Sequence, residues 1–218
     1  MPVELMPLSE LPEKDQKLIQ AIHHFWFGDL EESLPSPERF ALWFEPEPMT
    51  IQWIKDNYQK HIEAAGLGQY DHWLKCIEGQ LAQIILLDQW TKFVFEKQPE
   101  AYQYDAKALQ ISMEGASKEK EHDLTLIERA FYYFPLLHAE SDFLINNAIH
   151  CYNILKQYAL KETKKTYQKF LDIAEHHAKI IHAYGRFPTR NAVLGRMSSE
   201  DESLYLKALE DDHKLDVY

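Results

Sequence analysis

The sequence is poor in glycine and in cysteine. Glycine occurs only seven times in 218 residues, and the alternation of polar and apolar residues that marks strands is hard to find. The two cysteines, Cys76 and Cys151, form no CxxC pair. We therefore expect an all-α chain whose thiols are small buried groups in a reducing compartment.

Basic charge and long apolar runs are also scarce. Lysine and arginine number 23 against 35 acidic residues, which gives a net charge of -12. Such a surface repels the phosphates of nucleic acids and of anionic membranes, so neither is an expected partner. No apolar stretch approaches the ~20 residues of a membrane span, and the first residues lack the basic flank and apolar segment of a secretion signal. These absences predict a cytoplasmic protein.

Several motifs of well-understood chemistry are missing. The chain has no Gly-rich phosphate loop, no HExxH zinc motif, no Glu-x-x-His pattern of di-iron helices and no GxSxG nucleophile elbow. His138, Glu140 and His177 form only a weak metal-binding pattern. No cofactor and no metal are therefore expected, and whether the chain is an enzyme stays open.

Apolar residues recur with the helical period along nearly the whole chain. The most apolar segment, residues 79–96, is hydrophobic on nearly every side, so we expect it at the centre. Thr125 with Glu128, and Ser199 with Glu202, form capping boxes that predict two helix starts. Helices are expected over residues 13–27, 38–44, 50–65, 79–96, 100–114, 125–135, 138–160, 162–184 and 199–209.

The links between these helices are short, which favours antiparallel pairs. No linker is long enough or rich enough in glycine and serine to divide the chain. We therefore expect one helical domain over residues 1–218, a bundle or a short solenoid-like stack. The tail after about residue 209 is expected to fray.

Arginine is rare but concentrated in one loop. The chain has eighteen lysines and five arginines, and three of the five, Arg186, Arg190 and Arg196, lie within eleven residues. A guanidinium group binds carboxylates and phosphates through two parallel hydrogen bonds, which a lysine cannot form. The same loop contains a proline, which stiffens it, and two glycines, which permit tight turns. This composition indicates a rigid loop that binds a defined partner.

Acidic and imidazole groups elsewhere in the chain are candidates for that partner. Asp88 lies in the apolar helix, and a buried carboxylate without a counter-charge is costly, so it must be paired or protonated. The candidates for its partner are Lys92, one turn further on, and an arginine of the loop. Glu140 lies near the start of a long helix, where its charge is favourable, with His138 two residues before it. His177 shares a helix face with apolar residues and is expected to point inward.

These groups allow two interpretations. In the first they form one polar site, where His138 and Glu140 serve as acid or base and Trp26 and Trp43 form the walls. In the second, buried Asp–Arg pairs only fasten the loop to the core. For the neighbouring pair His23 and His24, which borders an apolar face, a capping or packing role is expected.

The segments FWFGD, LLDQW, FPLLHAE, GRFPTRN and LGR together resemble a known family. GRFPTRN followed by LGR is highly specific as a combination. From about residue 22 to about residue 206, the chain resembles the bacterial family numbered nine-hundred-and-twenty-four among domains of unknown function. The resemblance implies a helical, tetratricopeptide-like fold and carries no established activity.

The family's recurring residues coincide with most of the polar groups above. They map here to Phe25, Trp26, Phe27, Gly28, Asp88, Gln89, Pro135, Leu136, His138, Glu140, Gly185, Arg186, Phe187, Pro188, Arg190, Asn191, Leu194, Gly195 and Arg196. The ligand-binding residues that we expect are Asp88, Gln89, His177, Arg186, Arg190, Asn191, Arg196 and Trp26. The chain departs from the pattern at Lys92, Leu137, Ala139 and Thr189, where the family usually has Arg, Glu, Ser and His.

Two functions from different classes follow from these expectations. The first is binding of a small anionic molecule, a carboxylate or a phosphate, at the Arg/His/Glu cluster, with catalysis by His138 and Glu140. The alternative is a non-enzymatic tetratricopeptide-like adaptor that presents a concave, acidic surface to a peptide or protein partner. The concentration of arginine favours the first function.

Overall fold

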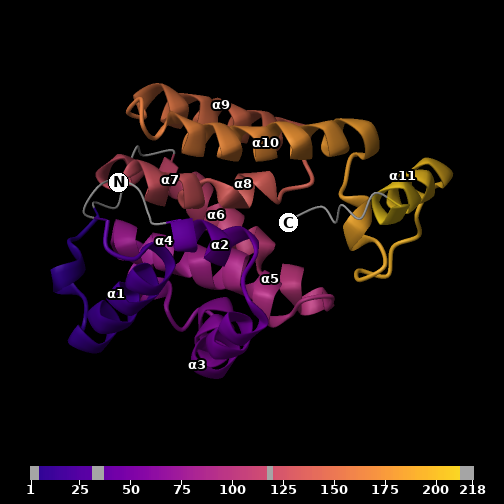
Figure 1. The fold of residues 1–218 in the computed structure, drawn as a ribbon. Helices are drawn as coiled ribbons and strands as arrows, with labels where there is room; N and C mark the ends of the chain where they lie inside the picture. The colour runs from indigo at the N-terminus through magenta and orange to yellow at the C-terminus, as the bar shows by residue number, and fades with distance from the viewer. Residues whose placement is uncertain (1–4, 31–36, 117–119, 212–218) are drawn as a thin grey trace.

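A computed structural model of the chain describes residues 5–30, 37–116 and 120–211. Within these ranges every regular element is helical, which confirms the all-α prediction (Figure 1). The α-helices are α1 (Glu13–Phe27), α2 (Pro37–Phe44), α3 (Pro48–Gly66), α4 (Ile77–Ile84), α5 (Trp90–Val94), α6 (Asp105–Ala116), α7 (Leu126–Tyr132), α8 (Phe134–Leu137), α9 (Asp142–Tyr158), α10 (Lys164–Tyr184) and α11 (Glu200–Asp211). The shorter turns are η1 (Leu8–Glu10), η2 (Asp71–Lys75), η3 (Ile85–Gln89), η4 (Pro99–Tyr102), η5 (Lys120–Asp123) and η6 (Pro188–Arg190).

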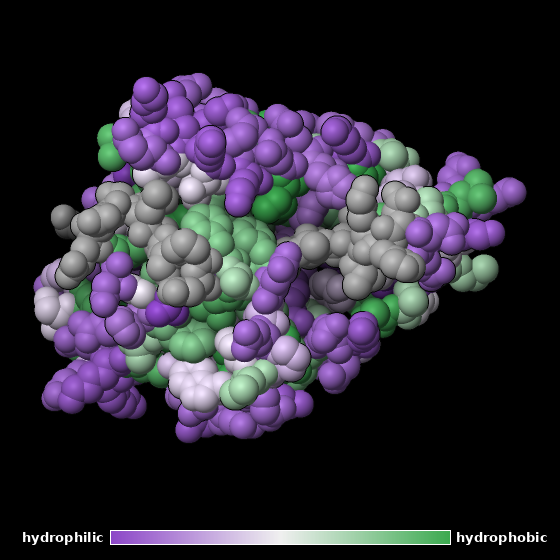
Figure 2. Space-filling model, viewed as in Figure 1, coloured by the Kyte–Doolittle hydropathy of each residue, from purple (hydrophilic) through white to green (hydrophobic). Residues whose placement is uncertain are grey.

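The two longest C-terminal helices form an antiparallel pair. α9 and α10 pack along their lengths and lie above the remaining helices in Figure 1. The outward surface of this pair is hydrophilic, as Figure 2 shows, because its apolar stripe faces the helices beneath. The helices thus form a bundle, and tetratricopeptide-like stacking stays a prediction.

The segment from α4 to α5 lies at the centre, as its all-round apolar character predicts. Its side chains from Leu81 to Trp90 are almost completely buried. Next to them the rings of Trp26, Trp43 and Phe131 meet, with the Trp43 and Phe131 centroids 4.6 Å apart. Large rings that pack edge to face stabilise a core beyond the area that they bury. The buried apolar side chains form one hydrophobic cluster, which surrounds the segment from α4 to α5.

This central segment is not the continuous helix that the sequence predicts. Between α4 and α5, η3 (Ile85–Gln89) is a π-helical turn. Such a turn contains one extra residue compared with an α-helical turn. It is rare in proteins and is frequently found at functional sites. It carries Asp88 and Gln89, two of the residues that the sequence assigns to the site.

The structure corrects the helix boundaries around His138 and Glu140. α9 begins at Asp142, and not at residue 138, because the Ser141 side chain caps it by accepting a hydrogen bond from the Leu144 N–H. His138 ends the short helix α8, and Glu140 lies in the bend before α9. Both side chains therefore project from a turn, where a bend in the backbone aims them toward other elements.

The other predicted ends agree more closely with the structure. Both capping boxes form: Thr125 pairs with Glu128 at the start of α7, and Ser199 pairs with Glu202 at the start of α11. Residues 100–104 belong to a 3-10 turn and its neighbours, so α6 starts only at Asp105. None of the described helices combines the length and the apolar character of a membrane span.

α11 extends to one side of the bundle, as Figure 1 shows. It packs against η6, and its Tyr205 ring lies 5.2 Å from the Tyr184 ring at the end of α10. Because its neighbours belong mainly to the loop between α10 and α11, this helix holds that loop from the outside.

Candidate functional site

The site begins at a buried carboxylate and an imidazole. Asp88 is fully buried in η3, and its Oδ1 lies 2.7 Å from Nδ1 of His138, which comes from the end of α8. Since the carboxylate is an acceptor, the Nδ1–H of His138 donates this hydrogen bond. His138 is itself buried, and within the described part of the chain its Nε2 has no hydrogen-bond partner. The pair thus fixes one tautomer and leaves the second ring nitrogen buried without a hydrogen-bond partner in the described residues.

Two further side chains keep the Asp88 carboxylate ionised. Gln89 Nε2 donates to Oδ2 over 2.6 Å, and Lys92 Nζ lies 3.7 Å from Oδ1. Burial alone would raise the pKa of Asp88, but the attraction of His138 and Lys92 and the hydrogen bonds from His138 and Gln89 lower it. Of the two partners that the sequence offers for Asp88, the structure places Lys92 beside it and no loop arginine.

Arg190 enters the site from η6 and packs on two aromatic rings. Its guanidinium carbon lies 4.7 Å from the ring centre of Tyr102 and 4.5 Å from that of Phe187. Nη1 donates to the His138 carbonyl oxygen over 3.0 Å and lies 3.5 Å from Oδ2 of Asp105. Two rings and one carbonyl therefore fix the plane of the guanidinium group.

A cavity of about 510 Å³ opens beside these groups. Its polar lining includes Tyr102, Asp105, His138, Glu140 and Arg190. Apolar walls are contributed by Leu109, Leu144 and Leu194. This combination of apolar walls with a few fixed polar groups is typical of small-molecule sites.

The acidic groups at the cavity are balanced by bases. Asp105 pairs with Lys92, which also faces Asp88, and with Arg190. Two carboxylates therefore face two fixed positive charges, and the cluster carries no excess negative charge that would repel an anion.

Glu140 forms a pair of its own with the loop. Arg196 holds it through two hydrogen bonds, Nη1 to Oε2 over 2.6 Å and Nη2 to Oε1 over 3.0 Å. The Phe187 N–H also donates to Oε1 over 2.9 Å. Burial raises the pKa of Glu140, but these hydrogen bonds outweigh it and lower the pKa overall. Arg196 also donates to the Asn191 side chain and to the Phe187 carbonyl, so all its nitrogens are engaged.

Arg186 lies outside this cluster. Its Nε and Nη2 donate to the two oxygens of Glu202 in α11 over 2.6 and 2.8 Å, and Nη2 also donates to the Met197 carbonyl. The three loop arginines thus have three different partners. Arg190 and Arg196 meet His138 and Glu140, whereas Arg186 fastens the loop to α11.

His177 and Trp26 do not line the cavity. His177 points inward, as expected, and its Nδ1–H donates to the Leu137 carbonyl over 3.2 Å. Burial and the nearby His138 lower the pKa of His177 to about 3, so it is neutral at pH 7. Trp26 is completely buried among core rings. Asn191 is also buried and links Arg196 to Ser198 within the loop.

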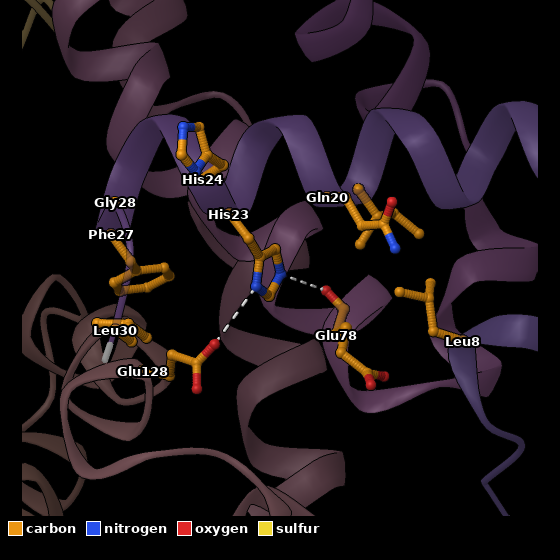
Figure 3. Close-up of a pocket in the computed structure, with 10 residues that line it drawn as sticks. Leu8, Gln20, His23, His24, Phe27, Gly28, Leu30, Glu78 and Glu128 are labelled. Atoms are coloured by element: carbon orange, nitrogen blue, oxygen red, sulfur yellow. Dashed lines mark hydrogen bonds and ion pairs between the residues drawn. The ribbon is translucent and has the colours of Figure 1, made fainter. Parts of the chain in front are cut away.

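A second, smaller hollow of about 250 Å³ lies at His23 on α1. Figure 3 shows the imidazole between two groups from other helices. Its Nε2–H donates to the Glu78 carbonyl over 2.9 Å, and its Nδ1 lies 3.4 Å from the Glu128 carboxylate. His23 therefore joins α1 to α4 and α7, in agreement with the packing role expected for it. His24 lies further out, beside Asp29.

Three residues that contact the loop arginines were not identified as their partners from the sequence. Tyr102 and Asp105 precede and open α6, and Glu202 lies in α11. Asp105 is one of 35 acidic residues and Tyr102 one of twelve tyrosines, so neither stands out by type. Only their spatial contacts with Arg190 and Arg186 reveal them.

Comparison with known proteins gives a family and a fold. The model of a family described as "Bacterial protein of unknown function (DUF924)" matches residues 22–210. A solved structure of a protein of unknown function from Agrobacterium tumefaciens is similar, with a TM-score of 0.71 and 25% sequence identity, over 88% of this chain and 98% of that chain. Comparison with curated proteins gives no match. The chain therefore belongs to the DUF924 family of bacterial proteins.

Proposed function

We propose that the chain binds a small molecule bearing a carboxylate or a phosphate in the cavity beside Arg190. The observation that carries the proposal is the state of this guanidinium group. A guanidinium has five N–H donors, and toward the described part of the chain Arg190 donates one hydrogen bond, through Nη1. Nη1 also lies 3.5 Å from the Asp105 carboxylate, and the other donors are available to a ligand in the cavity that Arg190 lines.

The other two loop arginines support this by contrast. Arg186 and Arg196 each hold a glutamate through two parallel hydrogen bonds and also bind a backbone carbonyl. Their fork of donors is already used, which suits a structural role. Arg190 is held instead by rings, which fix its plane and leave its edge free. Such a group is preorganised for a planar anion.

The Asp88–His138 pair supports an acid–base step on the bound molecule. A buried carboxylate that orients an imidazole through Nδ1 leaves Nε2 as the nitrogen that exchanges a proton. Nε2 of His138 is buried and has no hydrogen-bond partner within the described residues, and the residue contributes to the wall of the cavity. We therefore infer that His138 is the acid or base, and that Asp88 positions it from the π-helical turn.

Glu140 is better suited to positioning than to proton transfer. Its oxygens accept three hydrogen bonds from Arg196 and the Phe187 N–H, and its lowered pKa favours the ionised form. We infer that Glu140 and Arg196 fix the loop that delivers Arg190. The structural interpretation of the arginines thus applies to Arg196 and Arg186, and the ligand interpretation to Arg190.

Thermal-shift measurements with a panel of small carboxylates and phosphate esters test the proposal. A ligand at ~100 times its dissociation constant stabilises the folded state by about 2.7 kcal/mol. At least one compound is expected to raise the melting temperature of the wild type and not that of Arg190→Met. Arg186→Met is the matched control, because Arg186 lies outside the cavity, and it should respond as the wild type does. A panel without any stabilising compound would contradict the proposal and favour the adaptor alternative.

A further inference from the structure

Another cavity, of about 650 Å³, lies between η5, α7 and α9. It shares no lining residue with the cavity beside Arg190. Its polar lining includes Glu121 from η5, Arg129 from α7, Tyr133, and His150 from α9. Apolar side chains of Leu126, Ile154 and Leu155 complete it. The cavity therefore combines one fixed carboxylate and one guanidinium group with an apolar wall.

Glu121 is a buried carboxylate that the protein satisfies only in part. The residue is 4% exposed, and its Oε1 accepts a hydrogen bond of 3.0 Å from the Tyr133 hydroxyl. His122 Nε2 approaches the same oxygen to 3.7 Å. Oε2 is buried and has no hydrogen-bond partner in residues 5–30, 37–116 and 120–211. A buried polar atom without a partner costs free energy, and an ionised carboxylate oxygen only accepts, so this atom calls for a donor.

Arg129 lines the same cavity without a carboxylate partner. Its Nε donates to the Leu124 carbonyl over 3.0 Å and its Nη2 to the His122 carbonyl over 2.6 Å. These bonds hold the guanidinium group next to η5, the turn that carries Glu121. No ion pair joins Arg129 to a carboxylate of the described residues, and Nη1 stays free for an acceptor. A carboxyl group and a guanidinium group thus border one cavity, and no ion pair joins them.

We propose that this cavity binds a small zwitterion, an α-amino acid or a close relative, with the ammonium group on Glu121 and the carboxylate on Arg129. Each free group then gains a charge-assisted hydrogen bond of the matching polarity. The apolar wall receives the side chain of the ligand. A metal ion fits less well, because no three His, Cys, Asp or Glu side chains of the described residues come together with the geometry of a metal site.

Binding is measured by thermal shift and calorimetry with the twenty standard amino acids. At least one should raise the melting temperature of the wild type. Its decarboxylated amine and its deaminated acid, which keep the same side chain, should each bind at least about tenfold more weakly, because each loses one charge-assisted bond. The proposal is wrong if none of the twenty stabilises the protein, or if either single-charge analogue binds as tightly as the amino acid.

Two variants locate the binding. Glu121→Gln keeps an acceptor for the Tyr133 hydroxyl but removes the charge, and Arg129→Met removes the carboxylate partner. Each should weaken binding by at least about tenfold. Glu96→Gln, an exposed glutamate elsewhere on the surface, is the matched control and should bind as the wild type does. Unchanged affinity in both Glu121→Gln and Arg129→Met would overturn the proposal.

A native thiol gives a readout that needs no variant. Cys151 lines the cavity and is half-buried, whereas Cys76 is completely buried elsewhere. Burial raises the pKa of Cys151 to about 11, so alkylation by iodoacetamide is slow and is followed over hours near neutral pH, where the amino acid keeps its ammonium group. The stabilising amino acid should slow the alkylation of Cys151. An unchanged rate at saturating ligand would place the binding elsewhere and refute the assignment of this cavity.

Discussion

Three guanidinium groups of one loop differ in how many of their donors the protein already uses. Arg186 and Arg196 each bind both oxygens of a glutamate, while Arg190 lies between two rings and donates to one carbonyl. The difference follows from the partner offered by the fold, because all three residues have the same chemistry. Arg186 and Arg196 therefore hold the loop in place, whereas the loop presents Arg190 to the cavity.

This division predicts different stability costs. Arg196→Met breaks hydrogen bonds to Glu140, Asn191 and the Phe187 carbonyl, and should lower the free energy of unfolding by about 1–3 kcal/mol. Arg190→Met loses one hydrogen bond and the ion pair with Asp105, which keeps Lys92 as a partner, and the rings stay packed against an apolar chain, so its cost should be smaller. Urea unfolding of both variants measures this. A larger loss for Arg190→Met would identify Arg190 as a structural residue.

His177 gives a prediction about pH. Its pKa is lowered to about 3 in the folded state, against about 6.5 when unfolded. Between these two pKa values the unfolded chain binds more protons than the folded chain. The contribution of His177 to stability is therefore complete above about pH 6.5, and it is lost as the pH falls from about 6.5 toward about 3. The free energy of unfolding should decrease by at most about 1.4 kcal/mol per pH unit from this residue.

The variant His177→Gln isolates this contribution, because other groups titrate alike in both proteins. Urea unfolding between pH 6.5 and 4.5 should show a steeper decrease for the wild type than for His177→Gln. Parallel curves would mean that His177 binds protons equally in the folded and unfolded states, which would contradict its lowered pKa.

At the residue scale, the sequence indicates which residues belong to the candidate site more readily than it indicates which of them form pairs. The rarity of arginine marked Arg190 and Arg196, and both reach the neighbourhood of His138 and Glu140. Asp88 was expected to need a basic partner, and the nearest basic group is His138, fifty positions later and closer than Lys92. A pairing of this kind depends on how helices pack and leaves no trace in local spacing.

At the element scale, the loop between α10 and α11 depends on the glycine that ends α10. Gly185 has φ +70° and left-handed backbone geometry, and a Cβ atom there would meet no neighbouring atom within 4 Å. Glycine is thus required by conformation and not by space. This agrees with the stop predicted from the sequence at this position.

Gly185→Ala should therefore lower the free energy of unfolding by about 1–2 kcal/mol, the cost of left-handed backbone for a residue with a Cβ. Gly185→Asn should cost less, since asparagine tolerates this conformation better. Thermal unfolding of the two variants provides the comparison. Equal stability of Gly185→Ala and the wild type would contradict the role given to this turn.

α11 is expected to open more readily than the central helices. Its contacts are with η6 and the end of α10, whereas α4 and α5 are buried on nearly every side. Helices with few buried contacts open locally at low free energy. Hydrogen exchange should be faster in α11 than in α4, α5 or α9. Equal protection of α11 and α4 would show that α11 packs more firmly than its contacts indicate.

Element boundaries show the limit of sequence periodicity. The helical period of apolar residues predicted α1 correctly from Glu13 to Phe27, because Gly28 directly follows the helix and ends it. It missed the π-helical turn η3 and the bend before α9, since both lie within continuous apolar patterns. These two breaks position Asp88, His138 and Glu140. The least regular parts of the helices are therefore those that build the candidate site.

At the scale of the whole molecule, an acidic protein encloses a balanced cluster of charges. The net charge is -12, yet the three arginines of the loop and Lys92 each face a carboxylate. The acidic surface favours solubility, and the pairing keeps the cavity from excess negative charge. A small anion is thus bound by local donors and not by the overall field of the protein.

Calorimetry of the best-bound carboxylate or phosphate tests the central claim most directly. The dissociation constant should rise at least about tenfold in Arg190→Met, because a bidentate, charge-assisted contact is lost. It should stay unchanged in Arg186→Met, whose guanidinium group is bound to Glu202 away from the cavity. Equal dissociation constants for the wild type and Arg190→Met would contradict the account.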